Sequence, residues 1–474
     1  MASKDISFDS IPSSIRKPGK YFEFNTKMAV RLLPGNLQKV LLIGQRMAIG
    51  TVAATVPTDV FNDADAATMF GRGSILHSMV TAAITAYPYA AITAIALDDA
   101  PAGTQATGTV TLTGAATAAG ALTLWVGNDR IDAAISNGDT PTTVALALKT
   151  ALDKAPDLPV TAAVNAGVVT LTAKNKGTLG NTIKLTSSFA IAAGLVAAIS
   201  PMAGGATDPD IQAALTPIYS AGHNILCSSL MDAASLQKLR THLDAVGGPM
   251  EQRGAIGVYG NTGTLAQATT LALSINSGRT SSILVPSTPS LSWEVAAAYA
   301  AVIASEEDPA RPLNTLALIA IAPSPFASRL SRTEQENALY NGVTPTEVGP
   351  GDKVQIVRAI TTYTKDPQGI DDVSLLDLTT IRTLDYVRKA CRERIALRFP
   401  REKLSSRTAD KVWSELYDVL LKLEELEFVE QVVENKDKLI VQRDLQDANR
   451  LNARIPTDVV NGLHVFAGRI DLYL

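Results

Sequence analysis

Two glycine-containing segments near the start of the chain could bind phosphate, because backbone amides of such loops hold phosphate oxygens. In GQRMAIG, Gly44 and Gly50 follow an apolar run, but they enclose five residues and no Lys-Ser or Lys-Thr pair follows. In GRGSIL, Gly71 and Gly73 lack the third glycine of a dinucleotide-binding loop. These departures favour ordinary turns, so we predict no bound nucleotide or other cofactor.

Two further pairs of residues resemble parts of nucleophilic sites. Ser235 and Lys238 have the Ser-x-x-Lys spacing that lets a lysine deprotonate a serine, yet the companion motifs of that chemistry are missing. His223 and Cys227 stand in an apolar run typical of a strand, where residues four apart lie beyond hydrogen-bond distance. We therefore interpret the Ser-Lys pair as an exposed helix face and Cys227 as a small core residue.

Paired carboxylates, which general acid–base catalysis uses, occur at Asp98-Asp99, Glu306-Glu307 and Asp371-Asp372. Each pair stands beside a predicted loop or helix end, where solvated charge is the simpler interpretation. The sequence contains no Cys-x-x-Cys, His-Glu-x-x-His or acidic calcium-loop pattern. We predict no catalytic residue and no metal site, and hence a protein that is not an enzyme.

The composition indicates a folded protein without a bias toward charged partners. The 474 residues are 46% apolar, and 42 basic residues nearly balance 46 acidic ones, for a formal net charge of -4. This charge provides no overall field that would recruit nucleic acid or an anionic membrane, so we expect no direct nucleic-acid binding and no membrane insertion. The N-terminal residues lack the apolar core of a secretory signal. We expect a protein that is made in the cytoplasm and leaves it only within a larger assembly.

The alternation of apolar runs and amphipathic segments predicts an α/β core. The run KVLLIG from Lys39 is typical of a strand buried on both faces, and a helical stretch at 63–86 and a strand at 91–97 follow. After Pro209 the rhythm resumes with strands NILCSSL, GAIGVYG, SSILVP and LALIAI, separated by three helical segments. This order favours a mostly parallel sheet with helices on both faces.

The amino-acid composition changes between the two halves of this core. In residues 99–205 charge becomes sparse, and Thr and Val alternate between glycines, as in GTVTLTG and GVVTLTA. One helical segment, TPTTVALALKTALDKAP, lies among these strands. We predict an inserted β-rich domain at 99–205, whose low charge favours an outward decoration.

The last hundred residues combine two helices with opposite charge. A hairpin is expected at 343–360, turning through GPGD, before helices at Thr380–Arg398 and Thr408–Glu427. Between Arg382 and Lys411, ten basic residues outnumber four acidic ones, whereas acidic residues dominate 413–430. Two interpretations stay open: a solvated helical hairpin with internal salt bridges, or a docking face for another protein.

Both ends of the chain have strand patterns without an evident partner, ISFDSIPSSIRKPGKYFEFN (6–25) and LHVFAGRIDLYL (463–474). Pro12 and Pro18 cannot donate to a ladder, which confines them to edges or connections. We divide the chain into an N-terminal arm (1–30), an α/β core (31–98 and 206–365), the inserted domain (99–205), and a C-terminal helical and strand domain ending in a second arm (366–474).

The opening SIPSSIRKPGKYFEFN, the segment VLLIGQR, and the tail from TTYTKDPQGIDDVSLLDLTTIRTLDYVRKACRERIALRF to GRIDLYL resemble the contractile-tail sheath proteins of bacteriophages, most closely those of Mu-like phages. No single motif is a strict signature, and the resemblance depends on the order of these segments along the chain. It implies a structural subunit of the virion tail that forms stacked hexameric rings around an inner tube. Contraction of the sheath would drive the tube through the host envelope for genome delivery.

The resemblance also implies partners and contact residues. The partners would be other copies of the chain, the inner tail tube protein, and the baseplate and tail terminator proteins, with assembly in the host cytoplasm. Terminal arms would add strands to sheets of neighbouring subunits by main-chain hydrogen bonds. The arm residues expected at these interfaces are Ile6, Phe8, Ile11, Ile15, Tyr21, Phe22, Phe24, Val465, Phe466, Ile470, Leu472 and Leu474. The residues expected to face the tube are Arg388, Arg392, Arg398, Arg401 and Lys403.

Two alternatives remain. A sheath of a phage-derived bacteriocin or injection machine would have the same architecture with a different target. An α/β enzyme of unknown substrate would need polar residues at the carboxyl ends of the strands, and those ends have the small residues GQR, SSL, GNT, PST and APS.

Overall fold

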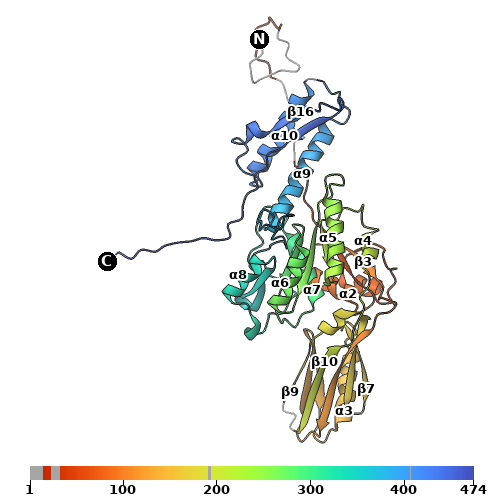
Figure 1. Ribbon diagram of the computed structural model, residues 1–474. Helices are drawn as coiled ribbons and strands as arrows, with labels where there is room; N and C mark the ends of the chain where they lie inside the picture. Colours follow the sequence, from red (N-terminus) through yellow and green to blue (C-terminus); the bar gives the residue numbers. More distant parts are fainter. Residues whose placement is uncertain (1–13, 23–32, 191–193, 406, 474) are drawn as a thin grey trace.

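The structure is a computed structural model that describes residues 14–22, 33–190, 194–405 and 407–473. Its centre is an eight-stranded sheet in the order β15-β14-β13-β12-β11-β1-β3-β2 (Figure 1). The inner strands run parallel, with Leu42 opposite Cys227, and the two edge strands are antiparallel to their neighbours. The strands are β1 (Lys39–Gln45), β2 (Thr58–Val60), β3 (Ala91–Leu97), β11 (Ile225–Ser228), β12 (Ile256–Asn261), β13 (Thr280–Leu284), β14 (Thr344–Gly349) and β15 (Lys353–Ile356).

Helices cover both faces of this sheet, which confirms the predicted fold class. On β12, a Cβ added at Gly257 would meet Leu243 of α5, whereas one added at Gly260 would meet the backbone of α7 at Ser292. Because strand residues three apart point to opposite faces, α5 and α7 lie on opposite sides. The core helices are α1 (Asp63–Phe70), α2 (Ile75–Ala86), α4 (Gln212–Leu215), α5 (Ala233–Gly247), α6 (Leu265–Ile275), α7 (Ser292–Ser305) and α8 (Arg332–Tyr340).

Two predicted core elements differ from the structure. The stretch at 63–86 is two helices, because Gly71 and Gly73 adopt φ of 88° and 75° and interrupt the helix between them. The run LALIAI is not a strand. It lies alongside β15 without regular strand pairing. Leu318 N–H donates to Val354 O, and Ala317 forms an isolated bridge with Gln355 before the chain turns. The predicted hairpin that follows is present as β14 and β15.

A β-rich body is inserted between β3 and α4. It contains a four-stranded sheet, β10-β4-β8-β7, and a three-stranded sheet, β6-β5-β9, at the end of the molecule away from both termini (Figure 1). Its elements are β4 (Gln105–Gly114), β5 (Gly120–Val126), β6 (Asp129–Ile135), α3 (Pro141–Asp153), β7 (Val160–Asn165), β8 (Val168–Lys176), β9 (Leu185–Ala190) and β10 (Leu195–Ala203). The domain boundaries assigned from the sequence stay a prediction.

The C-terminal part forms a smaller hydrophobic cluster of its own. Helices α9 (Leu378–Arg398) and α10 (Thr408–Glu425) pack together, and a two-stranded sheet of β16 (Ile440–Arg443) and β17 (Leu451–Arg454) lies beside α10. The strand pattern at 463–474 forms no strand within residues 463–473, where the chain extends away from the body (Figure 1). Short 3-10 turns occur at Thr178–Thr182, Phe326–Ser328, Pro350–Asp352 and Lys436–Lys438. None of the described helices is long and apolar enough to cross a membrane.

Candidate assembly interface

The C-terminal arm, here residues 463–473, exposes large apolar side chains. Val465 is 79% exposed, Phe466 87%, Ile470 98% and Leu472 84%. In the described chain, no backbone group of the arm bonds to another backbone group. A segment with apolar side chains and unpaired main-chain groups is suited to add a strand to a sheet edge.

The arm leaves the body at an anchored residue. His464 Nδ1 lies 3.0 Å from Asn314 Nδ2, and its Nε2 lies 3.4 Å from Asp377 Oδ1. Burial lowers the pKa of His464, and the neighbouring Arg358 lowers it further. The position where the arm begins is therefore fixed, while the residues after it are solvated.

The described part of the N-terminal arm is also exposed. Ile15 is 45% exposed, Tyr21 41% and Phe22 87%, and the Tyr21 hydroxyl donates to Lys17 O at 3.0 Å. Ile6, Phe8, Ile11, Phe24 and Leu474 lie outside the described residues.

The small sheet next to α10 offers edges that could receive a strand. β16 and β17 pair antiparallel, with Val441 opposite Ala453, and have no other strand beside them among the described residues. Trp413 Nε1 of α10 donates to Leu439 O at 2.8 Å, which fixes the start of β16 against the helix. Among the described residues, each of these two strands has an outer edge without a partner strand, and such an edge can accept a further strand.

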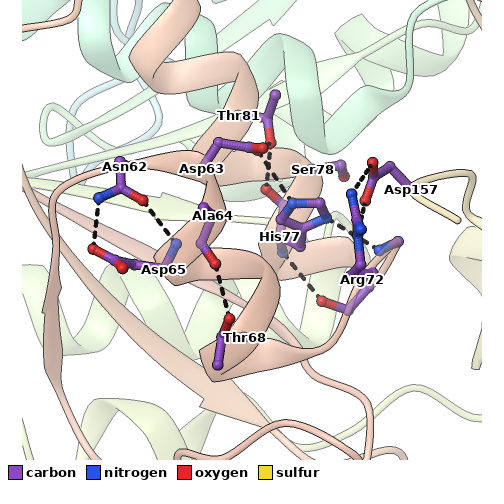
Figure 2. A network of polar contacts seen from close by, with 12 residues as sticks. Asn62, Asp63, Ala64, Asp65, Thr68, Arg72, His77, Ser78, Thr81 and Asp157 are labelled. Carbon is purple, nitrogen blue, oxygen red and sulfur yellow. Dashed lines mark hydrogen bonds and ion pairs between the residues drawn. The ribbon is translucent and has the colours of Figure 1, made fainter.

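The inserted body, by contrast, is joined to the core by polar contacts within the chain, one of which, between Arg72 and Asp157, is shown in Figure 2. Arg72 Nε and Nη2 donate to the two carboxylate oxygens of Asp157, at 2.7 and 2.8 Å. Next to it, buried His77 accepts from Gly73 N–H at 3.1 Å through Nδ1, and its Nε2 lies 3.2 Å from Asp63 Oδ1. Burial lowers the pKa of His77, and Asp63 opposes this shift.

Asp99 is the centre of the same junction. Its carboxylate accepts from Gln45 Nε2 at 2.6 Å, Asn175 Nδ2 at 3.0 Å and Lys176 N–H at 3.0 Å. Asn175 in turn accepts from Ile75 N–H at 3.1 Å. The expectation of solvated charge was therefore wrong for Asp99. The sequence feature that could have indicated this role is the position of Asp99 directly after β3, where the chain enters the inserted body.

The residues considered for chemistry do not form a reactive site. Lys238 Nζ pairs with Asp210 at 2.7 Å, not with Ser235, whose amide is bound by Asp232. Cys227 is fully buried in β11, and burial raises the pKa of its thiol. Among the described residues, no group of three or more His, Cys, Asp or Glu could hold a metal ion.

Comparison with known proteins identifies the family. The family model for the phage tail sheath protein central domain matches residues 204–362, and that for the phage tail sheath C-terminal domain matches 371–472. The Mu-like prophage FluMu tail sheath protein of Haemophilus influenzae is 35% identical over 486 residues, covering 99% of this chain and 100% of that protein. This chain belongs to the phage tail sheath family. It is a structural subunit of a phage tail, as the resemblance predicted.

Solved structures agree with the fold of this sheath protein. The sheath tail protein from Desulfitobacterium hafniense superposes with a TM-score of 0.52 at 14% identity, covering 94% of this chain and 97% of that one. A sheath protein in the contracted PVC extracellular contractile injection system gives 0.51 at 10% identity, covering 98% and 99%. At these identities the likeness concerns the fold alone.

Helices α9 and α10 of the sheath protein are joined by buried ion pairs. Arg394, whose side chain is 4% exposed, lies 3.1 Å from Glu415 and 2.6 Å from Asp418. Arg398 also contacts Glu415, at 3.1 Å. These contacts agree with one of the two interpretations of the sequence, the helical hairpin with internal salt bridges. They account for part of the opposite charges on α9 and α10.

The predicted tube-facing residues fall into two groups. Arg388 donates to Gly247 O at 2.7 Å and pairs with Asp385, and Arg392 donates to Gln252 O at 3.1 Å. Both therefore contact the core near the end of α5. Arg401 and Lys403 are exposed in the turn between α9 and α10.

Proposed function

We propose that this sheath protein polymerises as stacked hexameric rings around an inner tail tube and contracts to drive the tube through the host envelope. The observation that carries the proposal is the C-terminal arm, whose apolar side chains are 79% to 98% exposed at Val465, Phe466, Ile470 and Leu472. Burial of one such side chain contributes about 1.5 to 3 kcal/mol. One subunit cannot gain this energy from its arm, whereas a polymer can.

The acceptor for the arms is the β16–β17 sheet of neighbouring copies. Its two strands have open edges among the described residues, and strand addition there would pair backbone groups that both partners leave free. Strand addition depends on main-chain hydrogen bonds, so the contact survives when the subunit bodies move relative to one another. Contraction needs such links, because neighbouring subunits must stay joined while their bodies repack.

The inner tube is contacted through the turn between α9 and α10. Arg401 and Lys403 are exposed there, whereas Arg388, Arg392 and Arg398 would have to leave partners in their own chain. Exposed cations favour an acidic surface on the tube protein and an attachment weak enough to release on contraction. Baseplate and tail terminator proteins would cap the two ends of the polymer, which would be assembled in the host cytoplasm.

Electron microscopy of the purified protein, expressed alone and with its tube protein, tests this function. We expect striated hollow tubes in two lengths, a longer form around the tube and a shorter, wider form. Arg401→Glu with Lys403→Glu should reduce the tube-filled form and leave the empty form. A protein that stays monomeric under all these conditions would contradict the proposed function.

A further inference from the structure

A cavity of about 330 Å³ lies at the amino-terminal ends of β1, β11 and β12, where α9 crosses the core. Its walls include Lys39 at the start of β1, Ile256 at the start of β12, and Tyr386 of α9. The Tyr386 hydroxyl donates to Pro34 O at 2.8 Å, which holds the segment before β1 against the helix. The volume suits a side chain or a small anion, not a helix.

Cationic side chains outnumber acidic ones in the lining. They are Lys39, Arg253, Arg382, Lys389 and Arg392. The single acidic lining residue is Asp385. Its carboxylate is already bound by Arg279, at 2.7 and 2.9 Å, and by Arg388 at 2.7 Å. Asp385 is therefore not free to neutralise the other cations of the cavity.

The buried arginine of this lining lacks hydrogen-bond acceptors. Arg382 is 7% exposed and donates from Nη2 to Glu306 O at 2.6 Å, but its Nε and Nη1 have no partner among the described residues. The buried Nε of Arg253 also lacks a partner within the described part of the chain, although its Nη2 pairs with Glu251 at 2.6 Å. Burial lowers the pKa of Arg382 to about 10, while Glu306 and Asp308 oppose the shift, so the side chain stays charged at neutral pH. Leaving buried guanidinium N–H groups unpaired is costly, and carboxylates match their geometry.

We propose that this cavity binds a carboxylate side chain from a second copy of this chain. The donor is the acidic segment 425–434, which begins at the last residue of α10 and continues beyond the helix. Its carboxylates are exposed and form no ion pair with described residues, namely Glu425, Glu427, Glu430 and Glu434. This charge complementarity lies within one sequence, so every copy carries both halves of the contact. The choice of a second copy rests on the proposed polymerisation, whereas anion binding by the cavity does not.

The first measurement concerns the cavity alone. Citrate, a small polycarboxylate, is titrated into the full-length subunit fraction and its affinity is measured by calorimetry. We expect Arg392→Glu to weaken binding about tenfold or more, because it removes a charge-assisted contact. Arg332→Glu, the same charge change at an exposed residue of α8, should leave the affinity unchanged. Absence of citrate binding, or equal loss in both variants, would overturn the site.

The second measurement identifies the occupant. Lysine acylation, followed by mass spectrometry, compares Lys39 in subunits and in polymers of the full-length chain, with exposed Lys154 as the internal reference. We expect Lys39 to be protected in polymers and to regain reactivity in polymers of a Glu427→Gln, Glu430→Gln variant. Unprotected Lys39, or protection that survives these substitutions, would overturn the second-copy assignment. If no polymer forms, the proposed function fails, and the citrate titration still decides the cavity.

Discussion

The junction of the inserted body and the C-terminal arm are two attachments with opposite properties. At the junction, the carboxylate of Asp99 and the guanidinium of Arg72 bind side-chain and backbone groups of the same chain. In the arm, side chains such as Val465 and Ile470 are 79% and 98% exposed. The first attachment is made within a single subunit, whereas we propose that the second acquires its partners from other copies of the chain. This difference separates what holds the subunit together from what assembles it.

Deleting an arm should have the largest effect of all the changes considered, and the effect should be on sheath assembly. We expect chains lacking 1–21 or 465–474 to fold and stay soluble but to form no ordered sheath, because each loses a proposed strand donor, and the second deletion keeps the anchored His464. Negative-stain microscopy reports assembly, and thermal unfolding reports the fold. A matched control, Arg469→Ala with Asp471→Ala, removes an exposed ion pair but keeps every apolar arm residue. Normal tubes from either truncation would be fatal to the role of that arm.

Breaking the buried ion pairs of the helical hairpin should lower stability strongly. Arg394→Met removes the cation that joins Glu415 to Asp418. Arg398 still pairs with Glu415 and Lys422 with Asp418, so we expect a cost of about 2 to 3 kcal/mol. The free energy of unfolding, measured with urea, checks this. Arg401→Met removes an exposed arginine and should change it by less than about 0.5 kcal/mol. Equal effects of the two substitutions would show that the hairpin does not depend on its buried charges.

At the junction, Asp99→Ala should destabilise the protein by about 2 kcal/mol, because it removes the acceptor of Lys176 N–H and one of the two acceptors of Gln45 Nε2 and of Asn175 Nδ2. Sheath assembly should persist under conditions where the variant is folded. Urea unfolding measures the first effect and microscopy the second. Loss of assembly by a folded Asp99→Ala protein would break the separation between the two attachments.

Stability should also depend on pH through Glu294, which lies at the start of α7 near Asp129 of the inserted body. Burial raises the pKa of Glu294 to about 7, from an ordinary value of 4.5, and Asp129 adds to the shift. The folded state therefore favours the protonated form. The free energy of unfolding is therefore highest below pH 4.5, where Glu294 is protonated in both states, and it falls as the pH rises toward 7. Urea unfolding of Glu294→Gln should lack this part of the pH dependence. A slope identical to that of the wild type would rule out Glu294 as its source.

The smallest effect is expected for the exposed ion pair of the junction. The Arg72 guanidinium lowers the pKa of Asp157, but both side chains are about half exposed, so solvent screens the pair. Asp157→Asn should cost about 0.5 kcal/mol or less in urea unfolding, and high salt should abolish the difference. A cost as large as that of Asp99→Ala would show that the exposed ion pair stabilises the junction as much as the contacts of Asp99 do.

The sequence predicts elements whose signal is local. The parallel core, the helix ending at Arg398 and buried Cys227 follow from periodicity and Pro400, and the structure confirms them. Local sequence patterns do not predict the structure where it depends on backbone conformation or on contacts between residues far apart in the sequence. The positive φ values at Gly71 and Gly73 split a helix, and Asp99 is bound by Gln45 and Asn175, far away in sequence. The cationic cavity could not be foreseen, because its residues come from β1, β12 and α9.

The central claim is that the arms link subunits by strand addition. A cryo-EM map of the purified polymer that resolves the chain tests this claim most directly. We expect residues 463–473 of one subunit to form a strand beside β16 or β17 of another, with Val465, Ile470 and Leu472 buried at the contact. Arms that fold back onto their own subunit, or that remain solvated in an ordered polymer, would contradict this account.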